Sequence, residues 1–325
     1  MQYIIKSVDD DFVAGCHLRL CFAGTALVPH LTPALAHLSV SESNCQPDLT
    51  LYLWDSISTE SPRLIAPWSV EEITPRGEVP PYNNERFLTA VQLDMPGLHM
   101  LDRQRGIGLY WIDDCTDINV YERAAPLKVL LHWALCARGY PMIHAAAVGV
   151  DGAGALIVGK TGVGKSTTAL LCLSAGMQYI SDDRCLLGLR PEPTAYCIYN
   201  SAKLFPDQMQ RFPHLRSSVD QAPAVERQKM LVFVHQQAPE QVAERLPIRT
   251  TLLAHLTGRS ETTLSPVSPI QVLRELFTSS MVYQPGMAQE ELRLMAALVQ
   301  QVPCQQINLG TDLIRIPDVI ARSLL

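Results

Sequence analysis

The sequence predicts an α/β protein with two domains. The length of 325 residues suggests about two domains, at roughly 100–200 residues each. In the C-terminal part, short apolar runs typical of buried strands alternate with stretches of helical spacing. A glycine-rich loop there lies between one such run and a helical stretch. We therefore expect an N-terminal α+β domain over 1–122 and an α/β domain over 123–325.

Composition excludes several classes of protein. Hydrophobic residues make up 47% of the chain and charged residues 18%, which excludes a disordered chain of low hydrophobicity and high net charge. The net charge of −6 gives no general attraction to nucleic acid or to anionic membranes. We expect neither as a partner, and any phosphate binding must be local.

The chain also lacks the signals of export. No apolar run approaches the roughly 18–20 residues that span a bilayer. The N-terminal segment has neither the pattern of a signal peptide nor that of a transit peptide. The nine cysteines include no C-x-x-C pair, as expected for reduced thiols. These features predict a cytoplasmic protein without a membrane partner.

For the N-terminal domain, the sequence predicts short strands on both sides of a loop-rich connector. In Leu49–Trp54, leucine alternates with other residues, two of which are aromatic, and this pattern predicts a strand. Residues 58–87 contain five prolines and predict a loop-rich connector. Strands are expected again at Phe87–Leu93 and Gly106–Ile112. We expect this domain to support substrate selection.

A helix and a hairpin open the C-terminal domain. Apolar residues at helical spacing predict a helix at 125–138, with Pro126 in its first turn and Gly139 at its end. Two apolar runs follow, Ile143–Val148 and Ala155–Val158. Because turn residues join them, they predict a β-hairpin.

The stretch after the hairpin is a complete G-x-x-x-x-G-K-[ST] motif. It follows the predicted strand and opens a stretch that looks helical and ends at Gly176, which is the context that a phosphate-binding loop (Walker A, or P-loop) requires. The predicted nucleotide-binding residues are Gly159, Lys160, Thr161, Gly162, Val163, Gly164, Lys165, Ser166 and Thr167.

The residue types explain why this motif holds phosphate. Glycines allow backbone conformations in which successive N–H groups converge on phosphate oxygens, and the helix N-terminus adds its positive end. Lys165 can reach the β- and γ-phosphates, and the Ser166 hydroxyl can ligate Mg²⁺. The motif predicts binding of a nucleoside triphosphate, with ATP and Mg²⁺ as the expected cofactors.

Two carboxylates and one histidine are the further candidates for catalysis. Asp182 and Asp183 follow the predicted strand Met177–Ser181, at the edge of the sheet where ligands bind in α/β proteins. One of them could hold Mg²⁺ and the other could accept a proton from a hydroxyl nucleophile. His144 lies in the first run of the predicted hairpin and could orient or tune a neighbouring carboxylate.

These features together resemble the catalytic domain of HPr kinase/phosphorylase and its smaller relatives, which include peptide-modifying kinases. The residues that carry the resemblance are I-H-A-A-A-V, G-K-T-G-V-G-K-S and S-D-D, within 141–185. The resemblance implies a P-loop kinase module of the HPr kinase/PEP carboxykinase-like type. It implies that Asp183 is the general base, supported by His144. Lys165 and Ser166 would serve phosphate and Mg²⁺, and Asp182 would assist with the metal.

A looser likeness continues beyond this region, and some family features are absent. The likeness suggests Lys203, Arg227 and Lys229 as weaker candidates for contacting phosphate or substrate. Thr167 stands where the family has Glu, and the long catalytic loop with a second acidic metal ligand is not found. The family's phosphate-binding Arg has no secure counterpart in this sequence, so we do not include Arg249 among the site residues. We therefore expect neither HPr as the substrate nor the reverse, phosphate-removing reaction.

Missing motifs exclude other nucleotide enzymes. No N-K-x-D follows the loop, as guanine selection of the usual GTPase kind would need, and no L-S-G-G-Q of a transporter ATPase occurs. H-R-D and D-F-G, the signatures of eukaryotic-type protein kinases, are absent. In the remaining sequence we expect strands at Leu231–Val234, Thr250–Leu253 and Cys304–Leu309, and helices around Val272–Phe277, Glu290–Leu298 and Ile316–Leu324.

The sequence thus predicts an ATP-dependent transferase that moves the γ-phosphoryl group to a hydroxyl, most simply that of Ser on a protein or peptide. Two alternatives stay open: a kinase that acts on a small metabolite, and a nucleotide-binding regulator or assembly protein that transfers nothing. Homo-oligomerisation is also left open.

Overall fold

The chain forms two compact units. The computed structural model describes residues 2–5, 16–39, 46–221, 229–281 and 286–325. One unit comprises residues up to 138 together with 286–288, and the other comprises 139–281 and 289–325. The chain therefore passes from the first unit to the second at Arg138–Gly139 rather than at the expected 122/123. The reason is a helix, α4 (Lys128–Cys136), which packs on strand β5 (Gly97–Asp102) of the first unit.

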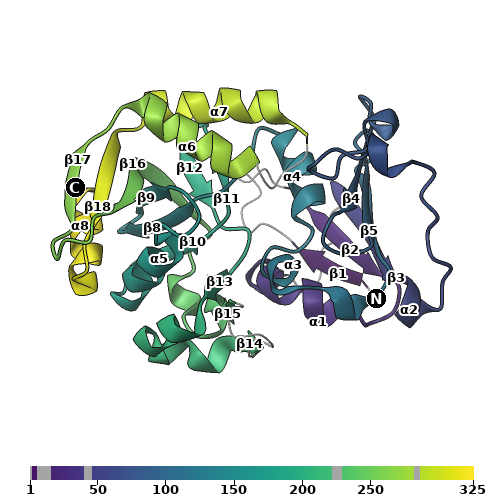
Figure 1. Ribbon diagram of the computed structural model, residues 1–325, viewed down its shortest axis with the longest axis horizontal. Coiled ribbons are helices and arrows are strands. Elements are labelled where there is room, and N and C mark those ends of the chain that lie inside the picture. Colours follow the sequence, from purple (N-terminus) through teal and green to yellow (C-terminus); the bar gives the residue numbers. More distant parts are fainter. Residues whose placement is uncertain (1, 6–15, 40–45, 222–228, 282–285) are drawn as a thin grey trace. The chain divides into compact units, whose positions relative to one another are not determined.

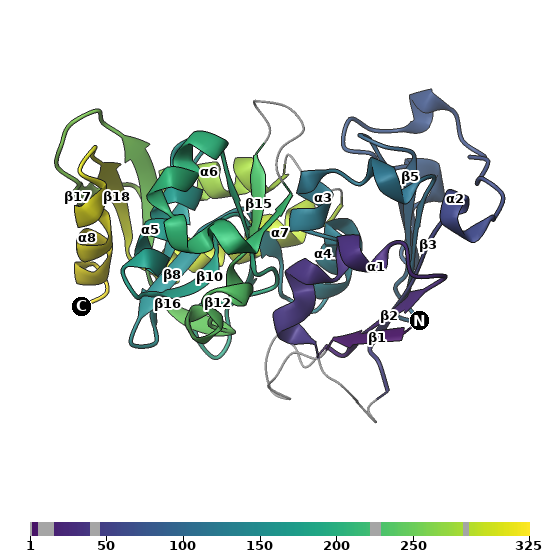
Figure 2. The ribbon, with the colours of Figure 1, turned by 90° about the horizontal axis from the view of Figure 1, so that it is seen from below.

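The first unit is built on a six-stranded mixed sheet in the order β1-β2-β3-β6-β5-β4. Strands β1, β2, β3 and β5 of this sheet are labelled in Figures 1 and 2. The pairs β2–β3 and β3–β6 are parallel, and the other pairs are antiparallel. The predicted strands at 49–54, 87–93 and 106–112 are all present, as β3, β4 and β6. The remaining bounds are β1 (Gln2–Ile5), β2 (Leu18–Phe22), β3 (Leu49–Asp55), β4 (Phe87–Gln92) and β6 (Ile107–Ile112).

Among its described residues, this unit has four α-helices: α1 (Val28–Leu31), α2 (Ser56–Thr59), α3 (Val120–Ala124) and α4. The helix expected at 125–138 begins later, because Leu127 has a left-handed backbone with φ of 58°. The Glu122 carboxylate fixes this junction: it accepts the Leu127 N–H at 3.1 Å and the Lys128 ammonium at 2.9 Å. Pro126 therefore precedes the helix instead of starting it.

The second unit contains a nine-stranded sheet whose main path runs β10-β8-β9-β16-β12-β11-β7. Strand β18 lies on the other side of β16 and carries β17 at the edge, so the sheet branches at β16. The bounds are β7 (Met142–Ile143), β8 (Ala146–Val150), β9 (Ala153–Val158), β10 (Gln178–Ser181), β11 (Cys185–Gly188), β12 (Thr194–Tyr196), β16 (Arg245–Leu256), β17 (Thr263–Pro266) and β18 (Cys304–Leu309).

Four strands of this sheet, β9, β10, β16 and β18, run in the same direction and end at the same edge. Strands β9 and β18 both run parallel to β16. Strand β10 is antiparallel to β8, which is itself antiparallel to β9, so β10 runs in the same direction as β9. The residues that follow β9 and β10 therefore emerge at a common edge, as the sequence predicted for the loop and the Asp-Asp pair.

The predicted hairpin is formed by β8 and β9. Its turn residues Asp151 and Gly152 have φ of 50° and 78°, the two positive values that a tight hairpin turn of this hand requires. The run expected as one strand at 143–148 is divided. Residues up to Ile143 pair with β11, whereas residues from Ala146 pair with β9 and β10, so a bend at His144 separates β7 from β8.

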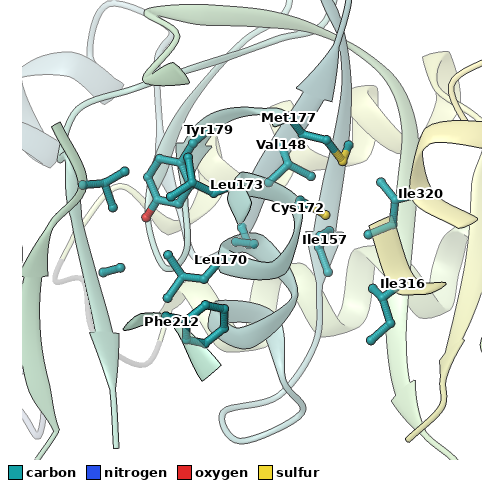
Figure 3. Close-up of a cluster of buried hydrophobic side chains, with 14 of the residues drawn as sticks. Val148, Ile157, Leu170, Cys172, Leu173, Met177, Tyr179, Phe212, Ile316 and Ile320 are labelled. Atoms are coloured by element: carbon teal, nitrogen blue, oxygen red, sulfur yellow. The ribbon is translucent and has the colours of Figure 1, made fainter. Parts of the chain in front are cut away.

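Two apolar cores cover the two faces of this sheet. Helix α5 (Lys165–Ser174) and helix α8 (Ile316–Arg322) pack on one face, and Figure 3 shows Leu170, Leu173 and Cys172 of α5 among Val148, Ile157 and Ile320. On the other face, side chains of α6 (Pro269–Met281) and α7 (Ala288–Gln301) join the alternate residues of β9. The alternation along β9 thus supplies both cores.

A small sheet completes the second unit, with the order β13-β15-β14. Its strands are β13 (Ser201–Leu204), β14 (Val219–Gln221) and β15 (Met230–Phe233), and the last corresponds to a predicted strand. The predicted strands at 250–253 and 304–309 lie in β16 and β18, and the helices expected near 272, 290 and 316 are α6, α7 and α8. Within the described parts of the chain, no helix combines the length and apolarity needed to cross a bilayer.

Candidate functional site

The glycine-rich loop connects β9 to α5, as the motif requires. Gly159 has φ of 153°, and a side-chain Cβ there would lie 2.9 Å from Val163 Cγ1, so this position has no room for a larger residue. Gly164 directly precedes α5 with φ of 98°, in the left-handed region that favours glycine. The loop can turn this tightly into the helix because both positions are glycine.

Lys165 is the first residue of α5 and is folded back over the loop. Its side chain is buried, and its Nζ donates to the carbonyl of Gly159 at 2.6 Å and to that of Lys160 at 3.3 Å. Burial lowers the pKa of Lys165, while Asp183 and Asp182 act in the opposite direction. The ammonium is therefore held at the loop by backbone dipoles and lies within electrostatic range of the two carboxylates.

Asp182 is the buried member of the Asp-Asp pair. It is 3% exposed, and its Oδ2 accepts the backbone N–H of Lys203 at 3.2 Å. Burial and then the charge of Asp183 raise its pKa, although a hydrogen bond with the Ser166 side chain acts against this. Ser166, the other predicted metal ligand, is therefore close enough to Asp182 to lower its pKa.

Asp183 is the more accessible member, with 26% of its side chain exposed. His144 Nε2 lies 2.9 Å from its Oδ1, and Lys203 Nζ lies 2.8 Å from its Oδ2. Arg184 Nε is 3.8 Å from the same Oδ2. Burial alone would raise its pKa, but Lys203, the His144 hydrogen bond and Arg184 lower the pKa well below its usual range. Asp183 is therefore ionised at neutral pH.

His144 lies at the bend between β7 and β8 and is buried. Its Nδ1 lies 3.3 Å from the carbonyl oxygen of Ser279, so each ring nitrogen faces an oxygen atom. Burial lowers the pKa of His144, and Asp183 raises it in part. Because ionised Asp183 can only accept, the ring nitrogen that faces it carries the proton.

The predicted catalytic residues His144, Lys165, Asp182 and Asp183 come from three stretches of the chain, and Lys203, one of the weaker candidates, joins them from a fourth. Of the other loop positions, Lys160, Thr161 and Gly162 are exposed, Val163 packs against the core, and Ser166 and Thr167 lie in the first turn of α5.

The weaker candidates differ in whether they contact the Asp-Asp pair. Lys203 in β13 ion-pairs with Asp183. Lys229 Nζ lies over the Phe205 ring, 5.3 Å from its centroid. Burial is the main cause of the lowered pKa of Lys165, and the charge of Lys229 lowers it further. Arg227 lies outside the described residues. Arg249, which the sequence gave no reason to include, pairs at the surface with Glu192 at 2.8 Å.

Sequence reasoning missed three residues of this cluster. Arg184 directly follows the Asp-Asp pair, and this adjacency was a signal that could have been used. Ser279 and Ser280 contact His144 from 135 and 136 residues further along the chain, and no local pattern marks them.

The residue types fit a nucleotide with Mg²⁺. The exposed glycine loop leads into a helix N-terminus, which suits an anion. Ser166 and Asp182 supply the hard oxygen ligands that Mg²⁺ prefers. Within the described residues, no group of three or more His, Cys, Asp or Glu side chains could hold a metal ion by itself.

Comparisons with known proteins add little. No family model matches the sequence. A search of curated proteins finds no match. Among solved structures, the chain is similar to the HPr(Ser) kinase/phosphatase from Coxiella burnetii, with 12% identity and a TM-score of 0.32, over 55% of this chain and 93% of that one. This is a weak structural resemblance.

Proposed function

We propose that the chain is an ATP-dependent phosphotransferase that moves the γ-phosphoryl group to a hydroxyl. One observation carries this proposal: a glycine loop with its lysine and an Asp-Asp pair end at the same sheet edge, and electrostatic coupling joins Lys165 to both carboxylates. A protein that only stored apolar ligands would have no use for this group of charges.

The chain's own residues divide the work by chemistry. Lys165 supplies a positive charge at the loop, and the loop amides supply further donors for phosphate oxygens. Ser166 and Asp182 together present the oxygen ligands for a divalent cation. Bound ATP with Mg²⁺ would provide the phosphoryl group and neutralise the charge that develops on its oxygens.

Asp183 is the proposed proton acceptor. His144 fixes its Oδ1, so that Oδ2 is the oxygen that can face a hydroxyl. Lys203 occupies Oδ2 at 2.8 Å, so its ammonium has to release this oxygen before a proton can be taken. The released ammonium would remain at the site as an additional positive charge for the transferred group.

The acceptor we propose is the hydroxyl of Ser on a protein or peptide, as the sequence resemblance implies. The first unit, with its own six-stranded sheet, is proposed to support the selection of this substrate. A small metabolite with a hydroxyl is the alternative acceptor. A panel of peptides and metabolites incubated with γ-labelled ATP separates the two by the product that carries the label.

The decisive variant is Asp183→Asn. We expect it to bind MgATP close to normally, since the loop residues are unchanged, and to lose about 10²–10⁴-fold in phosphoryl transfer. Asp318→Asn is the matched control, because Asp318 is exposed and pairs only with Arg315 among the contacts described. Transfer by Asp183→Asn at the wild-type rate would show that the base is misassigned.

The second candidate function is a nucleotide-binding module without transfer. The observation that favours it is that His144 and Lys203 engage both oxygens of Asp183 and lower its pKa, which makes a weak base. In this case wild type and Asp183→Asn would bind MgATP equally, and neither would label any acceptor in the panel.

A further inference from the structure

The bend at His144 is a place where the backbone leaves one strand ladder before it enters the next. Ile143 pairs with Cys185 of β11, and Ala146 pairs with Ile157 of β9. His144 lies between the two and is buried, so its backbone N–H needs an acceptor other than a strand. Ser280, in the last turn of α6, supplies it: the His144 N–H donates to Ser280 Oγ at 2.9 Å.

The position of Ser280 on its helix is unusual for a polar residue. Val272, Leu276 and Ser280 are the buried residues of α6, spaced four apart on one face. Leu276 packs in the apolar core that covers this face of the sheet, together with Leu156 and Val158 of β9. A third apolar residue would be expected in this stripe. The hydroxyl there is explained by the donor that it satisfies.

The same helix turn also faces the His144 ring. The Ser279 carbonyl lies 3.3 Å from Nδ1, and the opposite nitrogen, Nε2, lies 2.9 Å from Asp183 Oδ1. The backbone and the ring of His144 are thus both held by consecutive residues of α6. On the other side of the bend, the Ser181 hydroxyl donates to the Ala145 carbonyl at 2.9 Å, which ties the bend to the strand that carries the Asp-Asp pair.

We propose that Ser280 is a positioning residue of this site: by accepting the His144 N–H, it fixes the bend so that the imidazole lies between the Ser279 carbonyl and Asp183. This role deepens the proposed function and rests on it for its catalytic meaning. The geometry itself is independent of whether the chain transfers phosphate, so the two can fail separately.

The test compares Ser280→Ala with Ser279→Ala in the full chain. Ser279 contacts the ring through its backbone carbonyl, and its own hydroxyl bonds to the Leu276 carbonyl at 3.1 Å. Alanine at 279 therefore removes a hydroxyl from the same helix turn but leaves both contacts to His144 in place. This makes it a matched control for general effects on α6.

The first readout is the ring nitrogen NMR of His144 in ¹⁵N-histidine-labelled protein, assigned by the signal that disappears in His144→Gln. Wild type and Ser279→Ala should show two distinct, unaveraged ring nitrogen signals, with Nε2, which faces Asp183, protonated. In Ser280→Ala the two nitrogens should move toward averaged shifts, because the ring is no longer held. Unchanged His144 signals in a folded Ser280→Ala protein would overturn the proposal.

The second readout is enzymatic and requires an acceptor from the labelled-ATP panel. Ser280→Ala should lower kcat by about tenfold or more with the KM for ATP unchanged, since the phosphate loop is untouched. A purely structural role would instead lower thermal stability and leave kcat per folded molecule at the wild-type value, which would contradict the proposal.

Two further arms keep the test decisive. If Ser280→Ala does not fold, Ser280→Cys replaces it, because the thiol fills the space but is a weak acceptor, and the same averaging of the ring signals is expected. If wild type labels no acceptor, the NMR comparison still decides the role of Ser280. In that outcome the proposed function fails and the positioning of His144 is judged by itself.

Discussion

At the scale of single residues, the site is a balance of charge around Asp183. His144, Lys203 and Arg184 surround this carboxylate, and each comes from a different stretch of the chain. Its neighbour Asp182 is more deeply buried, and its pKa moves in the opposite direction, upward. Two adjacent carboxylates therefore have different protonation behaviour, which is the separation that acid–base chemistry requires.

The contribution of Lys203 to this balance can be measured through the pH dependence of stability. The pKa of Asp183 is lower in the folded chain than in the unfolded chain, where it is about 3.9. The ionised carboxylate therefore stabilises the fold at pH values above the unfolded pKa, and this contribution is lost as the pH falls through the folded pKa. Lys203→Met should raise the pKa of Asp183 and shrink this contribution. Lys203 also lowers the pKa of Asp182, so its loss acts in the same direction there.

In urea unfolding, the free energy of unfolding of Lys203→Met should therefore fall below that of wild type by more at about pH 7 than at about pH 3. We call this difference in free energy the stability deficit. Lys229→Met is the control, because Lys229 lies over Phe205 and makes no ion pair with Asp183 among the contacts described. Its deficit should be the same at both pH values. Equal deficits for Lys203→Met at the two pH values would show that Lys203 does not set the charge state of the carboxylates.

Residue patterns predicted the local parts of this site and missed the distant ones. The loop motif and the Asp-Asp pair are each contiguous, so their chemistry could be deduced from residue type and order. Lys203 was only a weak candidate, because nothing in the sequence shows that β13 places it beside Asp183. Ser280 could not be found at all, since its partner is 136 residues away.

At the scale of elements, the strand–loop–helix unit around α5 is the best determined part of the site. The sequence predicted β9 and α5 nearly at their observed bounds, because the apolar alternation, the glycines and the helical spacing all agree. The helix at 125–138 was placed too early, since the left-handed Leu127 depends on a buried Glu122. The split between β7 and β8 depends on pairing with β11, which lies further along the chain.

Packing of α5 on the sheet should hold the loop in place. Leu170 is fully buried, in the same core as Leu173 and Phe212 (Figure 3). Leu170→Ala should lower the free energy of unfolding by about 2–5 kcal/mol, because it removes buried apolar volume and leaves a cavity. Chemical denaturation of the two proteins at neutral pH measures this difference.

Ser174→Ala provides the comparison on the same helix. Ser174 is exposed, and its hydroxyl bonds only to the Leu170 carbonyl and to His214 among the described contacts. A change within about 0.5 kcal/mol is expected there. If both variants lost the same stability, the helix would not be anchored through its buried face.

At the scale of the whole molecule, the site belongs to one of the two units. Every described residue of the site lies between 139 and 281, from His144 to Ser280. The two-domain organisation was deduced from length, but the boundary was not, because α4 shows the same apolar spacing whichever unit it joins. The return of residues 286–288 to the first unit, where the Gly286 N–H donates to Glu78 at 2.6 Å, has no sequence signal.

This division predicts that residues 139–325 form an autonomous nucleotide-binding unit. Expressed alone, this fragment should fold cooperatively, because both cores of its sheet are complete within it, and should bind MgATP with an affinity within about tenfold of the full chain. Circular dichroism and calorimetric titration measure the two properties. Fragment 1–138 should be less stable than the same unit in the full chain, because it lacks the segment that contacts Glu78 and Trp133. A 139–325 fragment that folds but does not bind MgATP would show that the site needs residues of the first unit.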